Sequence, residues 1–161
     1  MDRLWTPWRY RYVSTAGRPG NACIFCEAAA SEDDRANYVV LRGERNFLIL
    51  NLYPYTSGHL MIAPYEHVAT LADAHPATLE EMMRLTARAE KVLREVYSPD
   101  GLNIGMNVGA AAGAGIPGHI HMHALPRWTG DASFMTTVSE TRVLPETIER
   151  TYERLSAALS L

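Results

Sequence analysis

Short apolar segments rich in β-branched and aromatic residues recur along the chain, with turn-forming residues between them. Segments of this kind are typical of β-strands. Five strands are predicted, at residues 38–42, 46–55, 59–64, 101–109 and 119–125. Gly43 and Glu44 lie between the first two segments, which therefore predict a β-hairpin.

Other segments repeat their apolar residues at helical spacing. Residues 75–97 do so over their whole length and have Pro76 near the start, which predicts a long amphipathic helix. A short helix is expected within residues 21–34, and a final helix from about residue 145 to residue 159. This order of elements predicts an α+β fold, in which helices cover one side of a mostly antiparallel sheet of about five strands.

Length and composition restrict the class of protein. A chain of 161 residues predicts one domain over residues 1–161, with an N-terminal arm at 1–20 and a C-terminal tail at 135–161. The aromatic and basic residues of the arm either stack bases or pack across the domain or a partner subunit. A net charge of -3 argues against nonspecific binding of duplex DNA. No apolar stretch is long enough to cross a membrane, and the start is too charged for a signal peptide. We therefore expect no nucleic-acid or membrane partner, and a cytoplasmic location.

His119, His121 and His123 occupy every second position of the last predicted strand. Successive side chains of a strand point to opposite faces, so these imidazoles share one face and the apolar residues between them point to the core. Three such positions span about 13 Å, so at most two of them can bind one zinc ion. Nucleophilic and acid–base catalysis is the other interpretation of this pattern.

Glycine and alanine dominate residues 105–118, directly before the histidines. Glycine lets backbone N–H groups approach an anion closely, although such a loop can also be only a flexible turn. Beside a row of histidines, the loop favours a phosphate site next to a nucleophile.

The stretch from His119 to Leu125 resembles the alternating histidine and apolar pattern of the histidine triad (HIT) family, and residues 126–128 strengthen the resemblance. Residues 46–64 resemble the nucleotide-binding strand pair of that family, and the resemblance covers roughly residues 20–135. Within the family, the chain looks closest to the bacterial diadenosine tetraphosphate hydrolases and phosphorylases. The resemblance implies a HIT-like fold and a homodimer. It also implies cleavage of a dinucleoside polyphosphate through a nucleotidyl-histidine, with water or inorganic phosphate as the acceptor and no organic cofactor.

The resemblance also implies a role for individual residues. His121 attacks the α-phosphorus, His123 donates a hydrogen bond to the phosphate or the leaving oxygen, His119 completes the catalytic set, and Asn51 contacts the ribose. The other expected nucleotide-binding residues are Asn107 near the bridging phosphates, Gly113, Ala114 and Gly115 through backbone N–H groups, and Trp128 beside the second nucleoside. Many members of the family have serine or threonine in this loop, whereas this chain has only backbone donors there.

Three other functions remain open from the residues alone. They are hydrolysis of nucleoside phosphoramidates, non-catalytic nucleotide binding or sensing, and metal-dependent hydrolysis with zinc at His119 and His121. The absence of aspartate and glutamate from residues 118–128 counts against the last of these.

The only two cysteines, Cys23 and Cys26, form a C-x-x-C motif, which in a reducing compartment indicates a metal site or a redox pair before a structural disulfide. Together with His59 and His119 they are expected to bind a structural zinc ion, an arrangement that the resemblance supports. Two buried thiols without metal are the alternative. His67 and His75 are interpreted as solvent-exposed or helix-capping residues.

Overall fold

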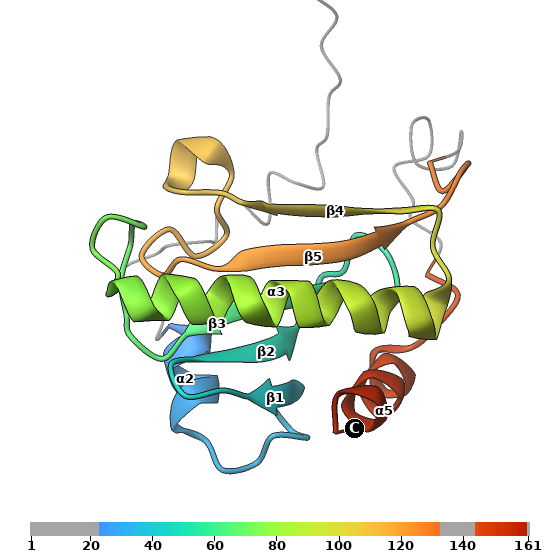
Figure 1. Cartoon of the computed structure of the whole chain (residues 1–161), viewed down its shortest axis with the longest axis horizontal. Coiled ribbons are helices and arrows are strands. Elements are labelled where there is room, and N and C mark those ends of the chain that lie inside the picture. The colour runs from blue at the N-terminus through green and yellow to red at the C-terminus, as the bar shows by residue number, and fades with distance from the viewer. Residues whose placement is uncertain (1–22, 133–143, 161) are drawn as a thin grey trace, which may run out of the picture.

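The computed structural model describes residues 23–132 and 144–160. The predicted N-terminal arm and residues 135–143 of the predicted C-terminal tail lie outside them. The strands are β1 (Val39–Arg42), β2 (Asn46–Leu50), β3 (Leu60–Pro64), β4 (Gly101–Met106) and β5 (Met122–Arg127). The helices are α2 (Ile24–Ala30), α3 (Pro76–Tyr97), α5 (Ile148–Leu159) and the 3-10 turn η1 (Ala110–Ala112). All neighbouring strands pair antiparallel in the order β1-β2-β3-β5-β4 (Figure 1), which confirms the predicted α+β fold.

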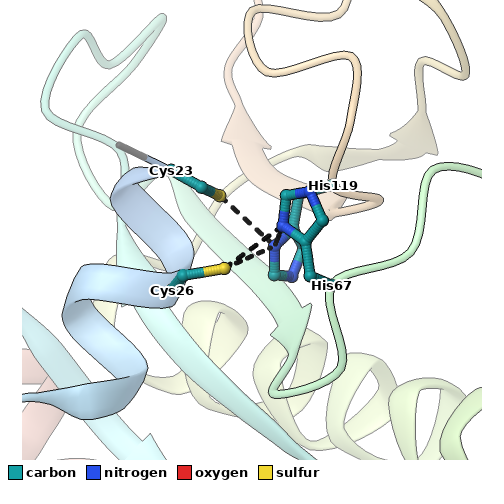
Figure 2. A group of neighbouring side chains, drawn as sticks. All are labelled: Cys23, Cys26, His67 and His119. Carbon is teal, nitrogen blue, oxygen red and sulfur yellow. Dashed lines mark hydrogen bonds between the residues drawn. The ribbon is translucent and has the colours of Figure 1, made fainter. Parts of the chain in front are cut away.

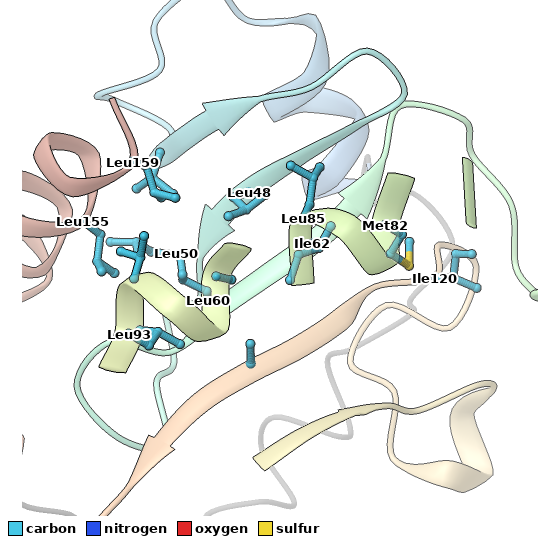
Figure 3. Packing of buried hydrophobic residues seen from close by; sticks show 14 of the residues in the cluster. Leu48, Leu50, Leu60, Ile62, Met82, Leu85, Leu93, Ile120, Leu155 and Leu159 are labelled. Carbon is cyan, nitrogen blue, oxygen red and sulfur yellow. The ribbon is translucent and has the colours of Figure 1, made fainter. Parts of the chain in front are cut away.

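Helices lie on both faces of the sheet, which corrects the prediction of cover on one side only. The main core lies between the sheet and the pair α3 and α5, and Figure 3 shows side chains of this cluster, among them Leu48, Ile62 and Leu155. A second buried cluster on the opposite face joins Phe25 of α2 to Phe47 and other strand residues. The two clusters use alternate strand residues, as the period of two in a β-strand requires.

The bounds of β2, β4 and β5 differ from the predicted ones by at least three residues, and β4 ends at Met106 instead of residue 109. β2 ends at Leu50, because the Asn51 side chain turns the chain by accepting a hydrogen bond from the Tyr53 backbone N–H at 2.9 Å. β5 begins only at Met122, because the Ile120 N–H donates to the Val68 carbonyl at 2.8 Å instead of to a strand. The histidines therefore straddle the start of β5.

The long helix α3 is anchored at its start and again two turns later. His75 is its N-cap and accepts a hydrogen bond from the Ala77 N–H at 3.1 Å, which confirms the predicted capping role. Glu81, which is 7% exposed, accepts hydrogen bonds at 2.8 Å from the N–H groups of Glu44 and Arg45 and from Asn46 Nδ2. Burial raises the pKa of Glu81, but these donors together outweigh it and hold the pKa below its usual value. The carboxylate thereby joins α3 to the β1–β2 turn.

We predict that Glu81→Gln lowers the free energy of unfolding at neutral pH by about 1–3 kcal/mol, because an amide cannot satisfy three donors that point at a carboxylate. A depressed folded-state pKa stabilises the fold above the unfolded pKa and loses that effect as the pH falls through the folded value. Urea titrations at pH 7 and pH 4 are therefore expected to show a smaller loss on acidification in the variant than in the parent. Equal losses in the two proteins would contradict this role.

Candidate active site and metal cluster

A row of paired residues crosses four strands on the face covered by α2. His123 on β5 pairs with Met61 on β3, Met61 pairs with Ile49 on β2, and Ile49 pairs with Val39 on β1. Phe25 of α2 packs over the histidine end, with its ring centroid 4.8 Å from that of His121. The imidazoles therefore lie on the α2 face of the sheet, opposite α3 and α5.

One nitrogen of His121 is held by the backbone. Its Nδ1 donates to the His119 carbonyl oxygen at 2.8 Å, and the side chain is 4% exposed. This hydrogen bond requires the proton on Nδ1, so Nε2 carries a lone pair in the neutral ring. Burial lowers the pKa of His121 more than the carbonyl raises it, which favours that neutral form.

A chain of hydrogen bonds orients His123. The Tyr55 backbone N–H donates to His59 Nδ1 at 3.2 Å, so a neutral His59 carries its proton on Nε2. His59 Nε2 lies 2.9 Å from His123 Nδ1 and donates to it. His123 then carries its own proton on Nε2. Burial and the neighbouring His121 lower the pKa of His123 to about 4, so this ring is a neutral hydrogen-bond donor at physiological pH.

Two cavities meet at His123 and Tyr55. The first, of about 420 Å³, is lined by His121, Asn51, Gly113 and Gly115 and by apolar residues of α2 and the strands. The second, of about 670 Å³, lies along β4 and β5 and is lined by Asn107 and Trp128. The structure thus brings Asn51, the two glycines and His121 together, and separates them from Asn107 and Trp128.

The glycine-rich loop borders the first cavity. Gly109 and Gly113 flank η1 with φ values of 84° and 91°, a region that L-residues with side chains rarely adopt. Gly113 and Gly115 line the cavity, whereas Ala114 is 8% exposed and is absent from its lining.

Cys23, Cys26, His67 and His119 form a compact cluster (Figure 2), in which one ligand atom from each lies within 4.8 Å of the others. His119 Nδ1 lies 3.3 Å from Cys23 Sγ and 3.2 Å from His67 Nδ1, and Cys26 Sγ lies 3.2 Å from His67 Nδ1. His119 Nε2 donates to the Pro64 carbonyl at 2.9 Å, which leaves its Nδ1 with the lone pair that a metal requires.

The donor set fits zinc. A tetrahedral ion with ligands at about 2.0–2.3 Å separates them from one another by about 3.3–3.8 Å. Four of the six pairs of ligand atoms are 3.2–3.7 Å apart, close to those separations, and all six pairs lie within 4.8 Å. Both cysteines are free thiols, so the sulfur atoms are available as ligands.

The structure places the predicted ligand His59 outside this cluster, and His67 occupies the fourth position. His59 is engaged with His123 and Tyr55, as described above. His67, interpreted from the sequence as exposed or capping, follows the end of β3 and reaches the cluster. The signal that identifies it is the antiparallel pairing of β3 with β5: the end of one strand lies beside the start of the other, where His119 precedes β5. His119 consequently lies in the metal cluster, away from the cavities.

None of the helices in the described part of the chain is long and apolar enough to span a membrane.

Comparisons with known proteins agree with the motif. The family model of the HIT domain matches residues 33–130. AP-4-A phosphorylase of Mycobacterium tuberculosis is 37% identical over 97% of this chain and 83% of its own length. The crystal structure of a Zn-bound histidine triad family protein from Mycobacterium smegmatis is 32% identical, with a TM-score of 0.70 over 86% of this chain and 94% of that one. The match to the domain model and the identity to these relatives show that the chain belongs to the HIT family.

Proposed function

We propose that this protein is an enzyme that cleaves dinucleoside polyphosphates through a covalent nucleotidyl-His121. The observation that carries the proposal is the His121 ring, which is buried beside the first cavity with its Nδ1 proton bound to the His119 carbonyl. The similar proteins support the substrate class, since one is named AP-4-A phosphorylase and a fission yeast relative, 32% identical over 59% of this chain and 52% of its own length, is named bis(5'-nucleosyl)-tetraphosphatase.

In the first step, the Nε2 lone pair of His121 attacks the α-phosphorus of a nucleotide bound in the first cavity. A P–N bond forms, and the bond from phosphorus to the bridging oxygen breaks. Asn51 contacts the ribose. The N–H groups of Gly113 and Ala114 donate to the carbonyls of Ala110 and Gly109, so the backbone N–H of Gly115 is the loop donor that stabilises the negative charge developing on the phosphoryl oxygens. The nucleoside polyphosphate leaves toward the second cavity, where Asn107 and Trp128 lie.

His123 assists the departure of the leaving group. Its Nε2–H is directed by the chain from Tyr55 through His59, so it donates a hydrogen bond to the bridging oxygen as charge builds there. In the second step, an oxygen of water or of inorganic phosphate attacks the same phosphorus, the P–N bond breaks, and the Nε2 lone pair of His121 is restored. Water yields a nucleoside monophosphate, and phosphate yields a nucleoside diphosphate.

We predict that the purified protein converts diadenosine tetraphosphate to AMP and ATP with water, or to ADP and ATP when inorganic phosphate is the acceptor. His121→Asn is expected to lower kcat by a factor of about a thousand or more, because the amide cannot form the covalent intermediate. Chromatography of AMP, ADP and ATP with and without phosphate measures both the turnover and the acceptor.

His75→Asn is the matched control, because it replaces a histidine that caps α3, keeps a good capping residue and leaves the cavities unchanged. Its turnover is expected to equal that of the parent. Full turnover in His121→Asn would overturn the covalent mechanism, and no turnover in the parent would overturn the substrate class.

We also propose that Cys23, Cys26, His67 and His119 bind one structural zinc ion. The cluster offers two thiols and two imidazole nitrogens within 4.8 Å of one another, a donor set that zinc accepts, and a similar HIT protein is described as Zn-bound. The ion would join α2 to the segments after β3 and before β5. All four positions are taken by protein ligands, which is typical of a structural rather than a catalytic site.

The zinc content of two variants is expected to show whether His59 or His67 is the fourth zinc ligand. The parent is expected to hold about one zinc per chain, His67→Ala to lose most of it, and His59→Ala to retain it, as measured by elemental analysis of the purified proteins. Chelation is expected to lower the melting temperature by removing the link between α2 and the sheet. Zinc loss in His59→Ala but not in His67→Ala would contradict the assignment.

Homodimer formation remains a prediction with one structural feature in its favour. β4 lies at the edge of the sheet and pairs only with β5 among the described residues, and the Ile104 side chain on it is 42% exposed. An exposed edge of this kind is a template for pairing with a second chain. Light scattering is expected to give about twice the chain mass of 17.9 kDa, and a monomer mass would contradict the prediction.

A further inference from the structure

The first cavity has a second polar end, far from the histidines. It extends across the sheet from His121 and His123 on the β5 side, past Asn51, to Asn37 and Tyr38 just before β1. Three strand steps separate β5 from β1, which corresponds to about 14 Å. This is about the length of one nucleotide, so a nucleotide with its phosphate at His121 directs its base toward Asn37.

The cavity between these ends is apolar. Ile49 and Met61, at 6% and 5% exposure, belong to the row of paired strand residues, and Phe25 of α2 lies in the same buried cluster. All three line the cavity. An apolar slot of this kind accepts any flat base, so a polar group at its far end is needed to distinguish one base from another.

The orientation of the Asn37 amide is fixed by the two groups that accept hydrogen bonds from its nitrogen. Nδ2 donates to the Asp33 carbonyl at 2.8 Å and to Ser31 Oγ at 2.9 Å. A backbone carbonyl can only accept, so the nitrogen must face Asp33 and the two N–H groups are used within the turn. The group that remains for a ligand is the acceptor Oδ1, which has no hydrogen bond among the described residues.

The next residue holds the backbone in an uncommon conformation. Tyr38 has a φ of 55°, which is costly for a residue with a large side chain and persists where the surroundings impose it. Its hydroxyl donates to Glu149 at 3.2 Å, and its ring packs edge-on against Tyr152. Contacts with α5 therefore hold Tyr38, the residue that follows Asn37. Asn37 is thus fixed by the hydrogen bonds of its own turn and by the contacts of the next residue.

We propose that Asn37 selects a base with an exocyclic amino group, as in adenine, by accepting a hydrogen bond at Oδ1. The inference rests on the proposed function, because it places the phosphate at His121. An amino group at the 6-position of a purine donates a hydrogen bond to Oδ1. A 6-oxo group is itself an acceptor, so it cannot form a hydrogen bond with Oδ1. Glu27 also lines this end, but its side chain is exposed and solvated, whereas Asn37 is half-buried and its amide is held by two hydrogen bonds.

Binding of AMP and IMP by calorimetry tests the proposal, because the two nucleotides differ in amino or oxo substitution at this position. The parent is expected to bind AMP about tenfold or more tightly than IMP, and Asn37→Ala is expected to bring the two affinities within about twofold of each other. Ser31→Ala is the matched control, since it removes a hydrogen bond from the same turn and keeps Oδ1. It is expected to retain the preference for AMP.

The outcomes distinguish this inference from the proposed function. Equal binding of AMP and IMP by the parent, or an unchanged preference in Asn37→Ala, would overturn the role of Asn37 and leave nucleotide binding intact. An equal loss of preference in Ser31→Ala would also overturn it, because the shape of the turn and not Oδ1 would then decide. Binding of neither nucleotide would overturn the proposed function and this inference together.

Discussion

The antiparallel pairing of β3 with β5 is the constraint on which both sites depend. Met61 lies opposite His123 and Ile62 opposite Met122, so the start of β3 is beside the middle of β5 and the end of β3 is beside the start of β5. His59 therefore meets His123, and His67 meets His119, at opposite ends of one strand pair. A slip of β5 by one residue would move His123 to the other face of the sheet, away from His59.

In three histidines, backbone groups determine which ring nitrogen carries the proton. Carbonyl oxygens of Pro64 and His119 accept from His119 and His121, and the Tyr55 N–H donates to His59. Backbone donors and acceptors cannot exchange roles as side chains do, so each ring presents a defined nitrogen to its site. The same type of side chain thus presents a lone pair or a proton to its site, according to the backbone group beside it.

Helix α2 connects the metal cluster to the cavity. Cys23 and Cys26 enter the cluster from the start of this seven-residue helix, and Phe25 between them packs on His119 and His121. A helix this short has little stability of its own, so tertiary contacts must hold it. The cluster and the Phe25 contact together keep one wall of the cavity in position over the sheet.

Local pattern is sufficient to predict which elements form and which face of the sheet carries the histidines. Histidines at alternate positions of a strand share one face, helical spacing identifies α3 to within one residue, and a distinctive motif indicates the family. Which distant residues meet depends on how the strands pair and pack. Sequence spacing carries no information about the register between β3 and β5, so it could not separate His59 from His67. It also could not show that Asn37 and His121, which precede two strands three steps apart in the sheet, border one cavity, because long-range contacts follow from pairing and packing and not from local pattern.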